Sequence, residues 1–274
     1  MAEPVDHAGT LNGEPAFWRR GEDSRPDLPP ILWVHGVPTS SDDWLPFLEV
    51  AGGIAPDLPG FGRTTKRGDH PYDIAWYCDW LDSFLDHLEV ERVRLCVHDW
   101  GGLALAWAQR NPERVDRLAV IDSVPLLPGY RWHRLARAWR TPMLGEMAMG
   151  LTIKPVLRLI SRESNATPGP LPKDLIDQTM EHFDQGTQRA ILRLYRSSPP
   201  ERLAAAGLDL GLLSGPSLVL WGKQDPYIPS EFAERYAEAL GNAKAEVIDG
   251  AGHWPWLDKP ELVGRICSFL DGSD

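Results

Sequence analysis

Short apolar runs alternate with longer segments of helical periodicity along most of the chain. Runs of the buried-strand type cover residues 31–34, 53–56, 93–97, 115–121, 217–221 and 245–248. Apolar residues at helical spacing mark 42–48, 74–88, 103–110, 230–240 and 261–270. An Asn12-Gly13 turn between alternating residues predicts a hairpin over 10–19. Strands that alternate with helices predict an α/β fold, with a mostly parallel sheet covered by helices on both faces.

The alternation stops after Asp122, and residues 125–213 have the pattern of helices and irregular segments instead. A break of roughly 90 residues is too long for a loop, so it predicts an inserted helical subdomain. We therefore divide the chain into a first part of the core at 1–124, a helical insertion at 125–213 and a second part of the core at 214–274.

Composition narrows the class of protein. The chain has 274 residues, 43% of them apolar, which is enough for a full core, and its net charge of −11 argues against nucleic-acid binding. The three cysteines are far apart and lack the spacing of disulfide or zinc sites, which favours a reducing compartment. No signal peptide and no apolar run of about 18 residues is visible. We expect a cytoplasmic protein that contacts no membrane and uses no metal or other cofactor.

The segment His98-Asp99-Trp100-Gly101-Gly102 carries the first candidate chemistry. It joins an apolar strand pattern to an Ala/Leu-rich helix and places Asp99 at the apex of the turn. An Asp in this place can simply cap the helix. A reactive side chain at such an apex is also the nucleophile elbow, and an attacking carboxylate forms an alkyl ester. This segment alone leaves both interpretations open.

Two further polar residues follow the late strands. Asp225 comes after the run 217–221, and His253 comes after the run 245–248. In a parallel sheet both would lie at the edge that carries Asp99, where ligands bind in open α/β sheets. Each alone could be a turn or loop residue. Together with Asp99, and in the order nucleophile, acid, base, these two residues predict a catalytic triad.

These motifs, with His35-Gly36-Val37-Pro38 and the loop at 57–62, resemble the α/β-hydrolase family in its branch with an aspartate nucleophile. The resemblance spans nearly the whole chain. It implies the α/β-hydrolase fold, with residues 125–213 as a helical cap over the active site. It also implies an oxyanion hole formed by the backbone N–H groups of Val37 and Trp100, which would stabilise developing negative charge.

The resemblance implies one of two reactions, epoxide hydrolysis or haloalkane dehalogenation. In both, an alkyl–Asp99 ester forms and is hydrolysed by water that His253 activates, with Asp225 orienting the imidazole. A halide would be held by Trp100 and a cap tryptophan, for which Trp132 and Trp139 are available.

Epoxide opening instead needs a proton, and Tyr195 is the candidate donor, with Tyr130 or His133 as a second acid. Val37 stands where many dehalogenases have an Asn donor, and the double glycine after Trp100 favours the epoxide branch. We therefore predict an epoxide hydrolase that forms vicinal diols, with haloalkane dehalogenase as the alternative.

The expected ligands are a small apolar epoxide and water, bound among Trp100, Trp132, His133 and Trp139. The 12 tryptophans fit either core packing or an aromatic pocket. A binding protein without turnover is the alternative from another class, and the complete triad argues against it. A homodimer is among the oligomeric states that remain open.

Overall fold

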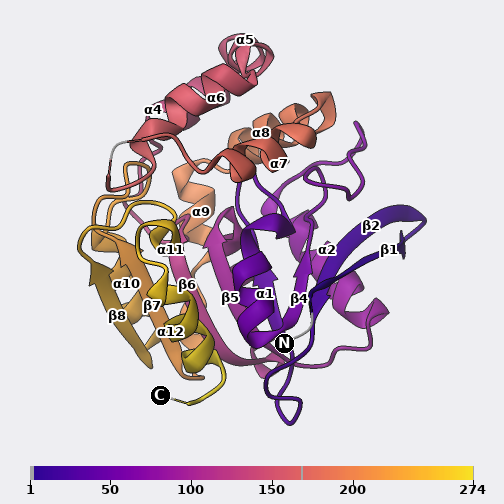
Figure 1. The fold of residues 1–274 in the computed structure, drawn as a ribbon, viewed down its shortest axis with the longest axis vertical. Coiled ribbons are helices and arrows are strands. Elements are labelled where there is room, and N and C mark those ends of the chain that lie inside the picture. The colour runs from indigo at the N-terminus through magenta and orange to yellow at the C-terminus, as the bar shows by residue number, and fades with distance from the viewer. Residues whose placement is uncertain (1–2, 168, 274) are drawn as a thin grey trace.

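An eight-stranded sheet forms the centre of the computed structural model, which describes residues 3–167 and 169–273 (Figure 1). The strand order is β1-β2-β4-β3-β5-β6-β7-β8. The strands are β1 Val5–Leu11, β2 Glu14–Gly21, β3 Ile31–Val34, β4 Gly53–Pro56, β5 Val93–Asp99, β6 Val115–Ser123, β7 Ser217–Gly222 and β8 Ala243–Ile248. The hairpin β1–β2 adds antiparallel strands to one edge, and β4, β3, β5, β6, β7 and β8 run parallel. The predicted fold class is confirmed.

Helices cover both faces of the sheet. Those of the core are α1 Leu45–Ala51, α2 Ile74–His87, α3 Leu103–Arg110, α10 Glu231–Leu240, α11 Pro255–Asp258 and α12 Glu261–Leu270. In β3, Ile31 and Trp33 pack into the core beneath α1, α11 and α12, whereas Leu32 and Val34 pack into the core beneath α2, α3 and α10. The sheet is buried on both sides, which is why its central strands read as continuous apolar runs.

Six α-helices lie between β6 and β7 in the part of the chain that the structure describes. They are α4 Arg134–Arg140, α5 Leu144–Leu151, α6 Lys154–Ile160, α7 Lys173–Glu181, α8 Gln185–Ser197 and α9 Pro200–Ala206. Figure 1 shows α4 to α8 stacked above one end of the sheet, with α5 and α6 farthest from it. Across the residues with described placement, no helix is long and apolar enough to cross a membrane.

Local chemistry explains where two of the helices begin. The predicted helix at 42–48 is a 3₁₀ turn, Ser41–Trp44, followed by α1, because Pro46 enters in the first turn of α1 and has no N–H to continue the preceding ladder. The side chain of Asp73 caps α2 by accepting a hydrogen bond from the Trp76 N–H at 2.9 Å.

Candidate active site

The turn after β5 presents Asp99 to the interior. Asp99 has a φ of 48°, in the left-handed region that most side chains avoid, and its carboxylate makes no capping bond to the 3₁₀ turn Trp100–Gly102 that follows. Instead its Oδ2 accepts a hydrogen bond from the Val37 N–H at 2.8 Å. The helix-capping interpretation therefore does not describe Asp99, which is held in a strained turn with its carboxylate facing another loop.

Glycine is required where Gly36 and Gly101 approach this turn. A Cβ on Gly36 would lie 2.4 Å from the Asp99 Cβ, and a Cβ on Gly101 would lie 2.1 Å from the Val34 carbonyl oxygen. Both distances are far below van der Waals contact. The absence of side chains at these two positions lets the turn pack against the loop after β3.

Asp99, Asp225 and His253 come together at the carboxyl edge of the sheet, as their strand positions predict. His253 Nδ1 lies 2.8 Å from Asp225 Oδ2, and His253 Nε2 lies 3.6 Å from Asp99 Oδ1. The other oxygen of Asp225 accepts hydrogen bonds from the N–H groups of Tyr227 at 2.7 Å and Ile228 at 3.1 Å. Asp225 is thus fixed by the backbone and in turn orients the imidazole toward Asp99.

Burial and charge act in opposite directions on this group. Burial raises the pKa of Asp99 despite the opposing influence of His253 and of the N–H groups of Val37 and Trp100. Burial lowers the pKa of His253, but Asp225 and Asp99 raise it by more, so the net pKa is above its ordinary value. The two carboxylates therefore shift the His253 imidazole toward its protonated form, while burial shifts Asp99 toward its neutral form.

Asp122, near the end of β6, is a third carboxyl group at the site, and it was not among the predicted site residues. It is fully buried, and its Oδ1 accepts a hydrogen bond from the Gly222 N–H at 2.9 Å. Its Oδ2 has no donor among the described residues, and the carboxyl group contacts that of Asp225. Burial and the charge of Asp225 raise the pKa of Asp122 well above its ordinary value. The only sequence signal was an Asp at a strand end, which is a common feature.

The loop that carries Val37 is held by a neutral histidine. His35 Nδ1 lies 2.8 Å from the Gly36 carbonyl oxygen, and the Leu58 N–H donates to His35 Nε2 at 2.9 Å. These two bonds fix one tautomer, with the proton on Nδ1. Burial lowers the pKa of His35, which keeps the ring neutral.

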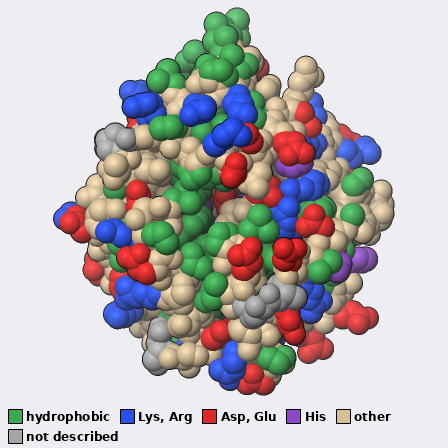
Figure 2. Space-filling view, in the orientation of Figure 1, with side chains coloured by type: hydrophobic (Ala, Val, Ile, Leu, Met, Phe, Trp, Pro, Cys, Tyr) green, Lys and Arg blue, Asp and Glu red, His purple; other side chains and the backbone are tan. Residues whose placement is uncertain are grey.

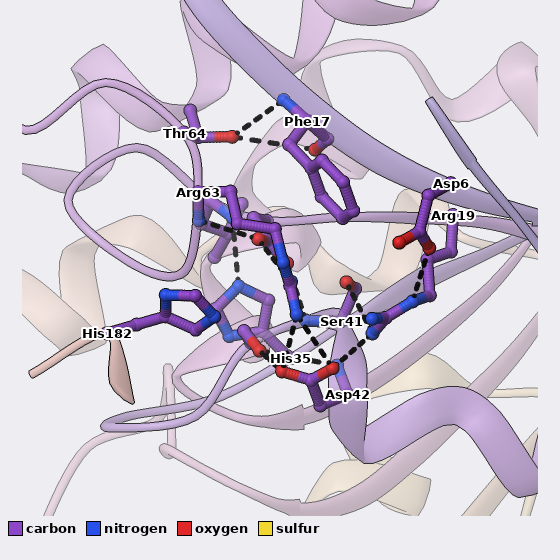
Figure 3. A network of polar contacts seen from close by, with 12 residues as sticks. Asp6, Phe17, Arg19, His35, Ser41, Asp42, Arg63, Thr64 and His182 are labelled. Atoms are coloured by element: carbon purple, nitrogen blue, oxygen red, sulfur yellow. Dashed lines mark hydrogen bonds and ion pairs between the residues drawn. The ribbon is translucent and has the colours of Figure 1, made fainter. Parts of the chain in front are cut away.

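A buried ion network surrounds the same loop (Figure 3). Arg63 pairs with Asp42 at 2.9 Å and with Asp57 at 2.8 Å, and Arg19 also pairs with Asp42. Asp57 accepts a further hydrogen bond from the Ser41 N–H at 2.8 Å. The network ties the start of α1, β2 and the loop after β4 together, and it anchors the backbone that positions the Val37 amide.

A cavity of about 280 Å³ lies over Asp99 and His253 and is closed on the far side by α4 to α8. Of the residues predicted to bind the substrate, Trp132, His133 and Trp139 line it, as does the predicted acid Tyr195, whereas Trp100 is not among the described lining residues. The Trp132 ring stacks on that of Trp100, with centroids 5.4 Å apart, and its indole N–H donates to the Ser198 carbonyl at 3.1 Å. Within the described residues, the buried indole N–H of Trp100 has no hydrogen bond of ordinary geometry.

The two residues predicted as a second acid differ in their surroundings. Tyr130 lines the cavity, and its buried hydroxyl has no partner among the described side chains and backbone. Burial raises the pKa of Tyr130 and that of Tyr195 well above their ordinary values, so both phenols stay protonated. Burial lowers the pKa of His133 to about 4, so this imidazole is neutral at neutral pH. Nowhere in 3–167 or 169–273 do three or more potential ligands gather to hold a metal ion.

Comparison with known proteins defines the class. Residues 29–260 match the family described as alpha/beta hydrolase fold. The chain belongs to the α/β-hydrolase family. A haloalkane dehalogenase of Bradyrhizobium diazoefficiens is 30% identical over 99% of this chain and 97% of its own length. One from Mycolicibacterium paratuberculosis is 32% identical over 89% of this chain and 84% of its own length.

Solved structures give the same picture. The crystal structure of haloalkane dehalogenase DbeA from Bradyrhizobium elkani has a TM-score of 0.84 and 27% identity, with 98% of each chain covered. An epoxide hydrolase, CorEH, has a TM-score of 0.81 over 98% of this chain and 99% of its own, but at 20% identity this likeness shows the fold alone.

The prediction of an epoxide hydrolase was wrong. It rested on the missing side-chain donor at Val37 and on the double glycine, whereas several relatives of about 30% identity that match most of the chain are named haloalkane dehalogenases. The structure offers a physical reason for the error. Within the part of the chain that the structure describes, the buried Trp100 indole N–H has no hydrogen bond of ordinary geometry, and such a donor suits an anionic leaving group as an Asn side chain would.

Proposed function

We propose that this hydrolase is a haloalkane dehalogenase, which converts an alkyl halide and water into an alcohol, a halide ion and a proton. The observation that carries the proposal is the indole N–H of Trp100, the residue after Asp99, which is buried and has no hydrogen bond of ordinary geometry within the described residues. The names of the relatives support the same assignment. The apolar cavity over Asp99 suits an uncharged alkyl chain.

In the first step a carboxylate oxygen of Asp99 attacks the carbon that bears the halogen. A C–O bond forms, and the carbon–halogen bond breaks with its electron pair leaving on the halide. Trp100 donates its N–H to the departing halide. Trp132 is already bonded to the Ser198 carbonyl, so Trp139 is the cap tryptophan left to act as a second donor.

In the second step His253 Nε2 accepts a proton from a water molecule, and the resulting hydroxide attacks the ester carbonyl carbon. The N–H groups of Val37 and Trp100 stabilise the oxyanion. The intermediate collapses, the alkoxide takes the proton from His253, and Asp99 is regenerated with one oxygen from water. Asp225 holds the imidazole in orientation throughout.

A substrate panel tests the assignment directly. With 1-bromohexane we expect equal amounts of bromide and hexanol, and with styrene oxide we expect no diol. Trp100→Phe should slow bromide release by about 10- to 100-fold, since a hydrogen bond to a charged group contributes about 1.5–3 kcal/mol. Tyr195→Phe is the matched control, because it changes one hydroxyl on a ring that contacts Trp100, and it should have little effect. Diol formation without bromide release would refute the proposal.

The covalent step has its own test. His253→Ala should accumulate a hexyl adduct on Asp99 that intact-mass spectrometry detects, whereas His253→Ala combined with Asp99→Asn should form none. Hydrolysis in ¹⁸O-water should place the label in the wild-type protein after several turnovers. A wild-type protein that stays unlabelled while it releases bromide would exclude the ester.

A further inference from the structure

The outermost helices of the chain expose an apolar surface. Six of the eleven large hydrophobic side chains that are exposed among the described residues lie between 143 and 159, each with 48–78% of its surface accessible. They are Met143, Leu144, Met147, Leu151, Ile153 and Leu159. We call this surface of α5 and α6 the α5–α6 tip, and Figure 2 shows it as a hydrophobic projection at the top of the molecule. Contiguous exposed apolar surface of this kind marks an interaction site.

The charge around the α5–α6 tip is opposite to that of the whole protein. Residues 131–163 contain seven arginines and lysines against two glutamates, a net charge of +5, whereas the chain carries −11. Figure 2 shows lysine and arginine side chains directly below the hydrophobic projection. Arg137, Arg158 and Arg162 are exposed and form no ion pair with any residue that the structure describes. Their charge is therefore available to a partner.

The α5–α6 tip is continuous with the wall of the active-site cavity. Leu151 lines the cavity and is also 67% exposed, so the same side chain faces both spaces. Val156 and Leu157 on α6 line the cavity as well. An apolar path therefore leads from the exposed tip to the space above Asp99.

We propose that the α5–α6 tip docks on the surface of an anionic lipid bilayer. The apolar side chains enter the boundary between headgroups and acyl chains, and the surrounding arginines bind lipid phosphates. An apolar face with a border of basic residues, here Arg137, Arg158 and Arg162, is typical of proteins that lie on a membrane. The helices α5 and α6 are too short to cross one. Docking would open the cavity toward the lipid, so that lipophilic substrates enter from the bilayer. The binding itself does not depend on the chemistry at Asp99.

A second copy of the chain fits this surface less well. A two-fold symmetric contact would place the same patch on both subunits. The basic border of one tip would then face the basic border of the other, and repulsion between like charges opposes that contact. Anionic lipid complements both the apolar and the charged part of the surface.

Co-sedimentation with vesicles tests the proposal. The probes are vesicles of phosphatidylcholine alone and vesicles of phosphatidylcholine mixed equally with phosphatidylglycerol, at low and at high salt. We expect wild-type protein to bind the mixed vesicles, to bind much less to phosphatidylcholine, and to lose affinity as salt screens the arginines.

Three variants locate the binding surface. Met147→Ser with Leu159→Ser should weaken binding by about 100-fold, since each side chain contributes about tenfold when buried. Replacing Arg137, Arg158 and Arg162 by Gln should weaken binding to mixed vesicles by about 100-fold. Leu208→Ser with Leu212→Ser is the matched control, because these side chains are 79% and 55% exposed but lie beside the core helices, and it should bind like wild type.

Two controls keep the outcome clear. The melting temperature of each variant shows that it folds, and bromide release from a water-soluble bromoalkane should stay unchanged because Met147 and Leu159 do not line the cavity. Failure of wild-type protein to bind mixed vesicles at low salt would overturn the proposal. So would tip variants that bind normally, or that convert a dimer to a monomer in the absence of lipid, since the occupant would then be a second copy.

Discussion

Asp122 offers a sharp test of how the acid behind His253 is held. The raised pKa of Asp122 keeps it protonated at neutral pH, so its O–H can donate to the carboxylate of Asp225. Its other oxygen accepts the Gly222 N–H. Asp122→Asn keeps an acceptor for Gly222 and a donor for Asp225, whereas Asp122→Ala removes both. The two variants therefore separate a hydrogen-bonding role from simple filling of space.

The magnitudes follow from the groups left without partners. In Asp122→Ala the buried Gly222 N–H loses its acceptor, which costs about 1–3 kcal/mol, and the Asp225 carboxylate loses a donor, which costs about 1.5–3 kcal/mol. Position 122 also has a φ of 37°, which Asn tolerates and Ala does not, at about 1 kcal/mol more. We expect the free energy of unfolding to fall by about 3.5–7 kcal/mol in the Ala variant and by less than about 1.5 kcal/mol in the Asn variant.

The assay joins stability to the pH dependence of ester hydrolysis. Without the donor at position 122 the charge of the Asp225 carboxylate is less compensated and attracts the imidazolium of His253 more strongly, so the acid limb of adduct decay should move to higher pH in Asp122→Ala. The Asn variant should keep the wild-type profile. Urea unfolding gives the stability, and decay of the hexyl adduct followed by mass spectrometry gives the rate. An Asn variant that is as unstable and as slow as the Ala variant would refute the argument, because it would mean that Asp122 acts as an anion.

Three further predictions concern the same site. Gly36→Ala should slow the bromide burst by more than about 100-fold without unfolding the protein, because the new Cβ would lie 2.4 Å from that of Asp99. Arg63→Met should lower the free energy of unfolding in urea by about 3–5 kcal/mol, since it leaves the buried Asp57 without its cationic partner and Asp42 with Arg19 alone; a loss below about 1 kcal/mol would contradict this. Because Asp225 favours the protonated form of His253, the rate of adduct decay should increase with pH as the imidazolium loses its proton, and a rate that falls as the pH rises would count against the geometry. The raised pKa of His253 also makes stability depend on pH. The stabilising effect of the charged His253 is fully present below its ordinary pKa, which applies in the unfolded chain. It is lost as the pH rises through the higher pKa of the folded protein.

Patterns that are local in the sequence predicted the fold well. The apolar runs gave the parallel strands because those strands are buried on both faces, and the strand ends placed Asp99, Asp225 and His253 at one edge. Asp122 escaped notice because its importance depends on the strand next to it, and nothing adjacent in the sequence marks that contact. The predicted helix began at residue 42, whereas α1 begins at Leu45, because Pro46 has no N–H to continue the preceding ladder of hydrogen bonds.

The nature of the leaving group could not be read from residue types alone. Tyr195 and Trp100 are both present in the chain, and a phenol could serve an epoxide as readily as an indole could serve a halide. The contacts of the donors in the folded chain narrow the choice. Among the described residues, the Trp132 N–H is bonded to a carbonyl, whereas the Trp100 indole N–H and the Tyr130 hydroxyl are both buried without a hydrogen bond of ordinary geometry. Since a buried donor without a partner is costly, each of these two groups is a candidate to bind an atom of the substrate, and Trp100 is the one that the proposed function uses. Under that proposal the choice of leaving group depends on which hydrogen-bond donors the fold leaves unsatisfied, and that property emerges only when the chain is folded.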